Sequence, residues 1–534
     1  MFYNRICDIV NCAQSSLVKR QSAIRTFLAC TLALLFLVSI PLTGYAATIY
    51  VGPNEYYKTI QAGMDAMNSG DTLIIRNGRY IGASNMIDWA HRPPDGTAAN
   101  YTKVKAETRG NVFIDGEDIR VPLSLEHAPT GSSYISFDGI KFGRSSGACV
   151  RIGYGNHIKF LNCAAFDSYP GDHLFSSYHS SYMLYENCWA WGHAQYAFHF
   201  RVCDHSIARR CVARIDWATT GDTYVSSFFN YESNYMEWQN CLVIDQDQDA
   251  YLDNNDAGAG GAFCFHLGNN GTINHDVAYR GCMVLNSFGS SGFLVSNQDY
   301  AITYNDCIVW DHKSNDLFYN RYHEVPQALY DHCTVGGTSL AGARGFYCSG
   351  FTGTTVRNSI VYGLTNGTAL MNIESADRNC LYGNAVNVSG TTSTNTLTST
   401  NPLSGSLKYL VRIEAGFPLD NAGTSGDIGA NIVYKIGTPG ALWGEPGYNT
   451  VTSMGLWPWE NENLIKADMG MYNNGGVTGS RGFCSGYSRD GTQQTLTKYI
   501  WEYLGNTIPD YIYDVQNDTT PPVVPGGVSV EVTN

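Results

Sequence analysis

A short apolar pattern repeats along most of the chain. In most copies a small residue, usually cysteine, stands three positions after one apolar side chain and two positions before another. Successive small residues are 21 to 41 positions apart, most of them in the low to mid twenties. A period of this size indicates one structural unit per repeat, each too small to bury a core alone. The small residues are Gly139, Cys163, Cys188, Cys211, Cys241, Cys282, Cys307, Cys333, Ser359 and Cys380.

A second pattern lies between these positions. Segments such as YAFHFRV and SSFFNYE alternate apolar and polar residues and are rich in aromatic and β-branched side chains, which favours strands over helices. Turns rich in Gly, Asn and Asp separate the segments, so each coil has at least two strands. Strands of successive repeats would stack in parallel. The pattern predicts an all-β fold, a single-stranded right-handed parallel β-helix of about ten coils.

This arrangement explains the cysteines. Each would point into the core and form a ladder of small apolar side chains, one coil apart, because a free cysteine behaves as a small buried hydrophobe. Stacked parallel side chains have poor geometry for disulfides. The spacing of CxxC metal sites is absent from the sequence. We therefore expect buried, reduced thiols with a structural role.

The first 46 residues have the features of an export signal. Lys19, Arg20 and Arg25 form a basic region, residues 27–40 are apolar, and the Gly-Tyr-Ala sequence at 44–46 fits a cleavage site. The stretch before Lys19 is long for a signal, so translation could begin later. The apolar run is too short to favour crossing a bilayer. We predict that residues 1–46 are removed and that the mature chain, without a membrane span, is secreted or held at the cell surface.

Net charge restricts the partners. Residues 1–46 contain four of the 33 Lys and Arg and one of the 47 Asp and Glu, so the remaining chain has a net charge of −17. Such acidity disfavours nucleic acid and anionic membranes as partners. It also disfavours a long polyanion, unless the binding surface is locally basic or a cation bridges the two. The composition, with 56 Gly, 36 Tyr and only 15% charged residues, fits an extracellular β-rich solenoid. We expect a monomer.

The start of the mature chain predicts a helical cap. Ile60, Met64 and Met67 give a short amphipathic helix that would cover the open end of the solenoid. The segments TIQAGMDAMNSGDTLIIRNGRY and YTKVKAETRGNVFIDG resemble the N-terminal cap and first coils of the pectate-lyase-like right-handed β-helix superfamily. The resemblance implies one solenoid domain over residues 47–435. Members of that superfamily include polysaccharide lyases and glycoside hydrolases.

Two further segments follow the solenoid. Residues 436–515 contain Trp457, Trp459 and Trp501 and one predicted helix at 492–504, and they are similar to the tails of secreted bacterial β-helix proteins. We expect this tail to pack on the C-terminal end of the solenoid, with an independent sugar-binding module as the alternative. Residues 516–534 are rich in proline and resemble a linker into a fibronectin-type-III-like domain.

The strand YAFHFRV carries the candidate chemistry. If Phe198 and Phe200 point into the core, His199 and Arg201 must point outward, because side chains alternate along a strand. A row of aromatic, Arg and His side chains on consecutive coils would suit a sugar chain, since rings stack on sugars and guanidinium groups bind carboxylates. The alternative is an ordinary solvated face. We predict His199 and Arg201 as catalytic residues, and Arg151, Tyr178, Tyr231, His266 and Arg321 as substrate-binding residues.

The longest interval between repeats contains DQDQDAYLDNND. Its aspartates stand at relative positions 1, 3, 5, 9 and 12, which is the spacing of oxygen ligands in an EF-hand-type loop, although the expected glycine is replaced by Ala250. Carboxylates this close repel one another without a cation. The sequence therefore predicts a Ca²⁺ site, with a solvated acidic loop as the alternative. The predicted ligands are Asp245, Asp247, Asp249, Asp253 and Asp256.

The functional hypothesis combines these features. A polysaccharide lyase needs a group that neutralises the uronate carboxylate and a base that removes the neighbouring proton, and Arg201, His199 and the aspartate loop could supply them. The motifs of pectate lyases and polygalacturonases are absent, and no lysine lies between Lys159 and Lys313. We therefore predict a lyase acting on an acidic polysaccharide, with a glycoside hydrolase as a weaker option. A non-catalytic glycan-binding or adhesin-like β-helix is the alternative.

Overall fold

The computed structural model describes residues 46–217, 225–246, 261–266, 276–296, 302–321, 328–349, 353–404, 409–474 and 476–505. The chain divides into two compact units, Met1–Ala46 and Ala47–Asn534. Apart from Ala46, the first unit lies outside the described residues, and so do residues 506–534. No helix in these described ranges is long and apolar enough to cross a bilayer.

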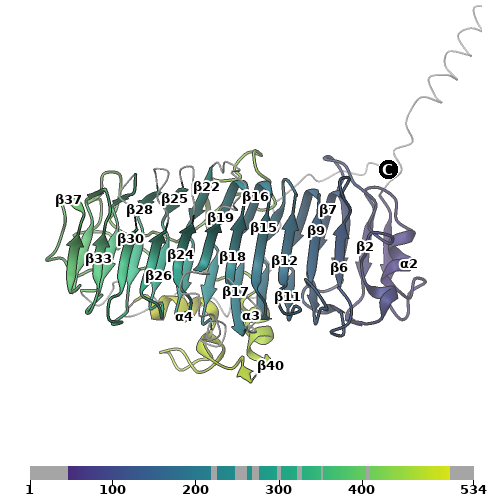
Figure 1. The fold of residues 1–534 in the computed structure, drawn as a ribbon. Helices are drawn as coiled ribbons and strands as arrows, with labels where there is room; N and C mark the ends of the chain where they lie inside the picture. The colour runs from purple at the N-terminus through teal and green to yellow at the C-terminus, as the bar shows by residue number, and fades with distance from the viewer. Residues whose placement is uncertain are drawn as a thin grey trace, which may run out of the picture. The chain divides into compact units, whose positions relative to one another are not determined.

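The second unit is a parallel β-helix with three strands in each coil (Figure 1). The predicted fold is confirmed, and the described residues form eleven coils with all three strands. Sheet A has the order β1 (Thr48–Val51), β2 (Thr72–Ile75), β4 (Thr102–Ala106), β7 (Ser133–Asp138), β10 (Asn156–Leu161), β13 (Leu184–Glu186), β16 (Asp204–Arg209), β19 (Asn234–Gln239), β22 (Val277–Arg280), β25 (Ile302–Asn305), β28 (Ala328–Asp331), β31 (Thr355–Arg357), β34 (Ser375–Asp377) and β37 (Thr392–Thr394).

The other two long sheets form the remaining sides of the solenoid. Sheet B has the order β3 (Gly78–Tyr80), β5 (Val112–Asp115), β8 (Ile140–Gly143), β11 (Ala164–Phe166), β14 (Trp189–His193), β17 (Val212–Trp217), β20 (Leu242–Ile244), β23 (Met283–Leu285), β26 (Ile308–Trp310), β29 (Thr334–Gly336), β32 (Ile360–Tyr362) and β35 (Cys380–Tyr382). Sheet C contains β6 (Leu123–Glu126), β9 (Val150–Gly153), β12 (His173–Tyr178), β15 (Tyr196–Arg201), β18 (Ser226–Tyr231), β21 (Gly261–His266), β24 (Ser291–Ser296), β27 (Asp316–Asn320), β30 (Arg344–Cys348), β33 (Thr368–Met371) and β36 (Val386–Ser389).

The remaining elements lie at the start of the chain and in the tail. They are the helices α2 (Ile60–Asp65), α3 (Glu462–Gly470) and α4 (Leu496–Tyr503), the 3-10 turns η1 (Ala83–Asn85) and η3 (Gly482–Cys484), and the short strands β38 (Tyr434–Ile436), β39 (Val451–Gly455), β40 (Asn473–Asn474) and β41 (Val477–Thr478). The predicted capping helix is confirmed as α2. Ile60 and Met64 belong to the solenoid core, and the Thr59 side chain caps the helix by accepting from the Ala62 N–H.

Stacked rings fill the core. On sheet C a column of phenylalanines stacks with ring centroids 4.6 to 5.0 Å apart. This spacing equals the distance between neighbouring strands, so each coil places its ring on the ring of the coil before. The column sets the register that turns the intervening residues of sheet C outward. Its members are Phe175, Phe198, Phe228, Phe263, Phe293, Phe318 and Phe346.

The cysteine ladder follows the first strand of each coil. Its seven thiols are free and fully buried. Six of them, all but Cys163, donate a weak hydrogen bond to a carbonyl of the preceding coil, as Cys188 Sγ does to Phe160 O at 3.4 Å. Burial raises the pKa of Cys211 well above its ordinary value. The predicted inward, reduced ladder is confirmed for Cys163, Cys188, Cys211, Cys241, Cys282, Cys307 and Cys333.

The last residue of the ladder is not the predicted Cys380 but the residue before it. Ser359 continues the ladder, but the next member is Asn379, whose Oδ1 accepts from the Ser359 N–H at 2.9 Å. Cys380 pairs with Ile360 in sheet B and packs on the outer side under the tail. The assignment of Cys380 to the ladder was therefore wrong. An asparagine amide can satisfy the same backbone groups at this turn, which the apolar pattern does not reveal.

The burial of these thiols can be measured. Twelve of the thirteen described cysteines are buried, and burial raises the pKa of the less buried Cys484 to about 11. Because the thiolate is the reactive form, we expect a disulfide-exchange reagent to label the native protein slowly, at one thiol at most. All of them should react on unfolding. An intact mass that indicates several disulfides would contradict this prediction.

The tail packs along the flank of the solenoid and not on its C-terminal end. Trp189 and Trp191 on the outer face of sheet B share one apolar cluster with Trp459 and Trp501 of the tail. Asp468 of α3 pairs with Lys141 near the N-terminal coils. Figure 1 shows α3 and α4 beside the strands of the middle coils. The predicted position at the solenoid end was wrong, because the outer face of sheet B is apolar and must be covered.

Buried arginines fasten the tail to sheet A. The guanidinium of Arg209 donates to Thr438 O at 2.7 Å, and that of Arg210 donates to Ile436 O at 3.0 Å. Glu186 pairs with Arg210 and lies 3.6 Å from Arg209, with side-chain exposures of 3% for Glu186 and 2% or less for the arginines. Glu186 also accepts from the Gly440 N–H at 2.7 Å. One buried carboxylate thus connects two coils and the tail.

A second fastening lies further along the tail. Arg214 is fully buried, pairs with Asp216 at 3.0 Å and donates to Met469 O at 2.7 Å. The crossing segment before the tail is held in the same way: the Asn431 N–H donates to Asp306, and the ring of His332 contacts Ser425 O at 2.9 Å. Polar contacts from successive coils therefore fix the returning chain.

His332 should make the stability depend on pH. Burial alone would lower the pKa of His332, but the hydrogen bond and charge of Asp331 outweigh burial, so the pKa is raised. A raised pKa in the folded state stabilises fully below the unfolded pKa of about 6.5, and this stabilisation is lost as pH rises through the folded value. We expect His332→Gln to remove roughly 1–2 kcal/mol at pH 5.5 and much less at pH 9. Urea unfolding at both pH values measures this, and equal losses would contradict it.

Candidate functional site

The register of sheet C places the predicted site residues in two outward rows. His199 pairs with Ser176 and Phe229 on the neighbouring strands. Arg201 pairs with Tyr178 and Tyr231. Phe198 and Phe200, which alternate with them along β15, belong to the core cluster. The predicted direction of both rows is confirmed.

Arg201 is an exposed cation held by two rings. Its guanidinium carbon lies 5.4 Å from the centroid of the Tyr178 ring and 5.3 Å from that of Tyr231. Both distances are within the range of a cation–π contact. The rings hold the guanidinium in place and leave its N–H groups open to solvent. No ion pair of Arg201 occurs within the described residues.

His199 points away from the core but is covered. Its side chain is 5% exposed, its Nδ1 lies 3.2 Å from Ser176 Oγ, and its ring meets His173 edge to face at 4.3 Å. Tyr196 and Phe229 cover it further. Burial lowers the pKa of His199 well below its ordinary value, and the charges of His173 and Arg201 lower it further. The expectation of an exposed His199 was wrong, because neighbouring outward rings cover this row.

This burial changes the expected effect of mutation. His199→Ala removes a packed ring and leaves Ser176 without its partner, so we expect a loss of about 1–3 kcal/mol in the free energy of unfolding. A His127→Ala variant alters an exposed histidine whose ring stacks on Trp89, and it should cost about 1 kcal/mol at most. Chemical denaturation measures both. Equal stability of the two variants would show that the ring is not structurally important.

A cavity of about 320 Å³ lies over this part of sheet C. His173, His199, Arg201 and Tyr231 are among the residues that line it. Burial lowers the pKa of His173 to about 4, and its Nδ1 has no hydrogen-bond partner among the described residues. Both imidazoles are therefore neutral at neutral pH. The lining residues are Gly171, His173, Gln195, Tyr196, His199, Arg201, Phe229 and Tyr231.

Five lining residues are not among the predicted site residues: Gly171, His173, Gln195, Tyr196 and Phe229. His173 and Tyr196 are the first residues of β12 and β15 and pair with each other across the coils. Tyr196 and His173 lie three positions before His199 and its neighbour Ser176, so strict alternation would turn them inward. The structure instead buries the next residues, Ala197 and Leu174, in the core. Two consecutive inward residues break the alternation at the start of both strands, so the pattern of the sequence gives no signal for His173 and Tyr196.

The other predicted binding residues lie at different places. Arg151 is in the His199 row but pairs with Asp172 at 3.0 Å and lies 3.9 Å from Glu126. Arg321 directly follows β27, beyond the cavity. His266 pairs with Tyr231 through the backbone register, and its side chain lies outside the described part. Arg201, Tyr178 and Tyr231 are thus the predicted residues that come together most closely.

The aspartate loop is described only at its first residue. Asp245 is buried, and its oxygens accept from Tyr499 Oη at 2.7 Å, Asn286 Nδ2 at 2.7 Å and the Phe483 N–H at 2.8 Å. These contacts give its carboxylate a structural role in holding the tail. Within the described ranges, no cluster of three His, Cys, Asp or Glu side chains is arranged to hold a metal. Asp247, Asp249, Asp253 and Asp256 lie outside those ranges, so the Ca²⁺ site stays a prediction.

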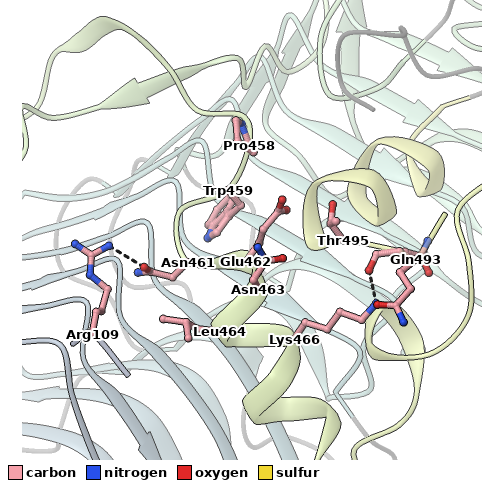
Figure 2. Close-up of a pocket in the computed structure, with 11 residues that line it drawn as sticks. Arg109, Pro458, Trp459, Asn461, Glu462, Asn463, Leu464, Lys466, Gln493 and Thr495 are labelled. Carbon is pink, nitrogen blue, oxygen red and sulfur yellow. Dashed lines mark hydrogen bonds between the residues drawn. The ribbon is translucent and has the colours of Figure 1, made fainter. Parts of the chain in front are cut away.

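A larger cavity, of about 760 Å³, lies between the solenoid and the tail (Figure 2). Arg109 comes from the turn between β4 and β5, and the other residues come from the tail. Figure 2 shows Arg109 and Asn461 on one side and Lys466 and Gln493 on the other. The cavity shares no lining residue with the cavity on sheet C.

These features define the protein as a parallel β-helix with an arginine–tyrosine groove on one outer sheet. No protein-family model and no curated protein matches the chain. It is similar to the solved structure of an alginate lyase from Paenibacillus sp. str. FPU-7, with 13% identity, a TM-score of 0.38, and coverage of 66% of this chain and 99% of that one. It is also similar to pectate lyase Pel9A, with 16% identity, a TM-score of 0.41, and coverage of 72% and 95%.

A further similar structure is a PL6 family polysaccharide lyase from Pseudopedobacter saltans, with 13% identity, a TM-score of 0.35, and coverage of 70% of this chain and 98% of that one. A pectin methylesterase from carrot matches at 10% identity and a TM-score of 0.32, over 49% of this chain and 83% of its own. We base the function on the geometry of the groove itself.

Proposed function

We propose that this protein is a secreted, carbohydrate-active β-helix protein that binds an acidic polysaccharide along sheet C and cleaves it as a lyase. The observation that carries the proposal is the exposed Arg201 side chain, which lies between Tyr178 and Tyr231 and lines a cavity of about 320 Å³. A guanidinium fork binds a carboxylate with two parallel hydrogen bonds. Flanking rings offer apolar surface to sugar rings, so the arrangement suits a uronate in a chain.

The local charge supports an anionic ligand. The whole chain has 47 Asp and Glu against 33 Lys and Arg, so a polyanion needs a local cation to approach. Arg201 supplies this cation, since no carboxylate among the described residues forms an ion pair with it. Arg151, by contrast, is engaged by Asp172. The carboxylate of the substrate should therefore bind at Arg201 and not at Arg151.

The lyase step would use the neighbouring imidazole. Arg201 would neutralise the uronate carboxylate and so acidify the adjacent C–H. With Nδ1–H of His199 donating to Ser176 Oγ, Nε2 is free to accept the proton. The C–H electron pair would become the C=C bond of the product, and the glycosidic C–O bond would break, with its oxygen leaving as a hydroxyl after protonation. His199 is neutral at neutral pH, as a base must be.

One observation favours the alternative function. Burial lowers the pKa of His199 well below its ordinary value, which weakens it as a base, and only 5% of its side chain is exposed. A groove with a strong carboxylate clamp and a weak base would bind an acidic glycan without cleaving it. A glycan-binding or adhesin-like β-helix is therefore the second candidate, and it uses the same Arg201 clamp.

One experiment separates these functions. The purified protein is incubated with a panel of uronate polysaccharides, with Ca²⁺ or with a chelator, and ultraviolet absorbance of the unsaturated product is followed together with reducing ends. Growth of both signals supports the lyase, and loss of both in chelator supports the predicted cation. Reducing ends without the absorbance would indicate a hydrolase. Co-sedimentation without cleavage would support the binding protein, and neither binding nor cleavage on any polymer would refute the proposal.

A further inference from the structure

We propose that the cavity between the solenoid and the tail is an oxyanion-binding site, built from the N-terminus of α3, Lys466, Arg109 and the indole of Trp459. Its ligand class is a carboxylate or a sulfate group, as carried by acidic sugars. The site is independent of the sheet C groove, because the two cavities have no residue in common.

The first turn of α3 offers unused backbone donors. The helix has nine residues, and its N-cap residue Asn461 has a left-handed backbone with φ 62° and makes no side-chain capping hydrogen bond. The Ile465 N–H closes the first helical turn by donating to Asn461 O. Across the described residues, the N–H groups of Asn463 and Leu464 have no acceptor. Such groups, with the helix dipole, attract anions.

An unpartnered buried donor points to the same ligand. Trp459 is 2% exposed, and its Nε1–H has no hydrogen-bond partner among the described residues. Figure 2 shows its ring on the cavity wall, with the nitrogen on the side of Asn461 and Arg109. A buried N–H without an acceptor is costly, and an anion in the cavity could satisfy it after a small ring movement.

The charged side chains complete a donor-rich lining. Lys466 donates to Gln494 O and keeps two further N–H groups. Arg109 binds Glu460 and Asn461 through Nη1, and its remaining N–H groups are available. Glu462 is the one carboxylate among the described lining residues, and it already accepts from the Thr497 N–H of α4 at 2.9 Å. The lining side chains thus carry two cations against one carboxylate, which favours an anion over a cation.

The test follows the Trp459 indole N–H resonance by NMR in the full protein, with Trp459→Phe giving the assignment. Sodium sulfate, galacturonic acid and the neutral methyl glucoside are titrated separately at constant ionic strength. We expect saturable shifts with sulfate, galacturonic acid or both. A response to only one of them identifies a sulfate ester or a uronate as the natural group. No saturable shift with either anion, or an equal shift with methyl glucoside, would overturn the proposal.

Three variants test the location. Lys466→Met keeps most of the length of the side chain, removes its charge and should weaken anion binding about tenfold. Lys103→Met removes an exposed lysine on β4 of sheet A and should leave binding unchanged. Arg201→Ala, in the sheet C groove, should also leave this titration unchanged. Melting temperatures equal to wild type establish folding. If a variant does not fold, the wild-type protein is tested instead, by displacing bound sulfate with phosphate. Unchanged anion binding in Lys466→Met would refute the site.

Discussion

Glu186→Ala is expected to lower the free energy of unfolding by about 3–5 kcal/mol. The carboxylate pairs with Arg210, lies 3.6 Å from Arg209 and accepts from the Gly440 N–H of the tail. All three side chains are buried, so removing the carboxylate leaves two cations in the interior without their counter-charge. Such uncompensated charges cost far more than the loss of a surface ion pair.

Loss of structure in the Glu186→Ala variant should begin in the tail. Residues 436–448 contact the solenoid at this point through carbonyls bound by the two arginines, so their protection should fall before that of the coils. Chemical denaturation gives the global loss, and hydrogen exchange locates it. Glu186→Gln keeps the shape and one acceptor, and it should cost less. Asp118→Ala removes a carboxylate that is 62% exposed and pairs with Arg144, and it should cost about 1 kcal/mol at most.

A loss below about 1 kcal/mol for Glu186→Ala would contradict this prediction. It would mean that water enters the site and solvates the arginines when the carboxylate is removed. Hydrogen exchange in residues 436–448 would then match that of the wild type. The same comparison tests whether the tail is a structural part of the solenoid, as its contacts with Arg209 and Arg210 imply.

The sequence predicted the solenoid because its repeat is enforced in every coil. A residue that stacks on its equivalent one coil away must be of similar size, so the phenylalanine column and the cysteine ladder are visible as a period. The terminal Asn379 was missed because a polar side chain can take the ladder position through hydrogen bonds to the backbone. Size alone does not reveal such a substitution.

The tail could have been placed from the sequence of sheet B. Segments such as CWAW, CLVI and CMVL are continuously apolar, and strands that are buried on both faces have this pattern. The buried arginines could not be predicted, since Arg209 and Arg210 look like surface residues until their acceptors, carbonyls more than 200 positions away, are known.

The sequence predicted which way the side chains of His199 and Arg201 point, but not whether they are exposed to solvent. Alternation along β15 turns both His199 and Arg201 outward, and that part was confirmed. Whether an outward residue is exposed depends on its neighbours one coil away. Phe229 and Tyr196 cover His199, whereas Tyr178 and Tyr231 hold Arg201 at the surface. The difference in exposure between His199 and Arg201 can be read only from the register that pairs residues of neighbouring coils.

Arg201→Ala is expected to weaken binding of a uronate polysaccharide by on the order of 30-fold, about 2 kcal/mol. The variant removes the one cation that faces the cavity without an ion pair among the described residues, and with it the two-pronged hydrogen bond to a carboxylate. The side chain is exposed, so the melting temperature should not change. Affinity electrophoresis or calorimetry on the polymer identified in the panel measures the loss.

Arg201→Lys separates charge from geometry. Lysine keeps the charge but lacks the planar fork and stacks less well between Tyr178 and Tyr231, so binding should fall to an intermediate value. Lys103→Ala, which removes an exposed cation from sheet A, should leave affinity unchanged and controls for the general effect of charge on a polyanion. If Arg201→Ala binds as tightly as wild type, or loses no more than Lys103→Ala, the polysaccharide does not use this clamp and the groove lies on another face of the solenoid.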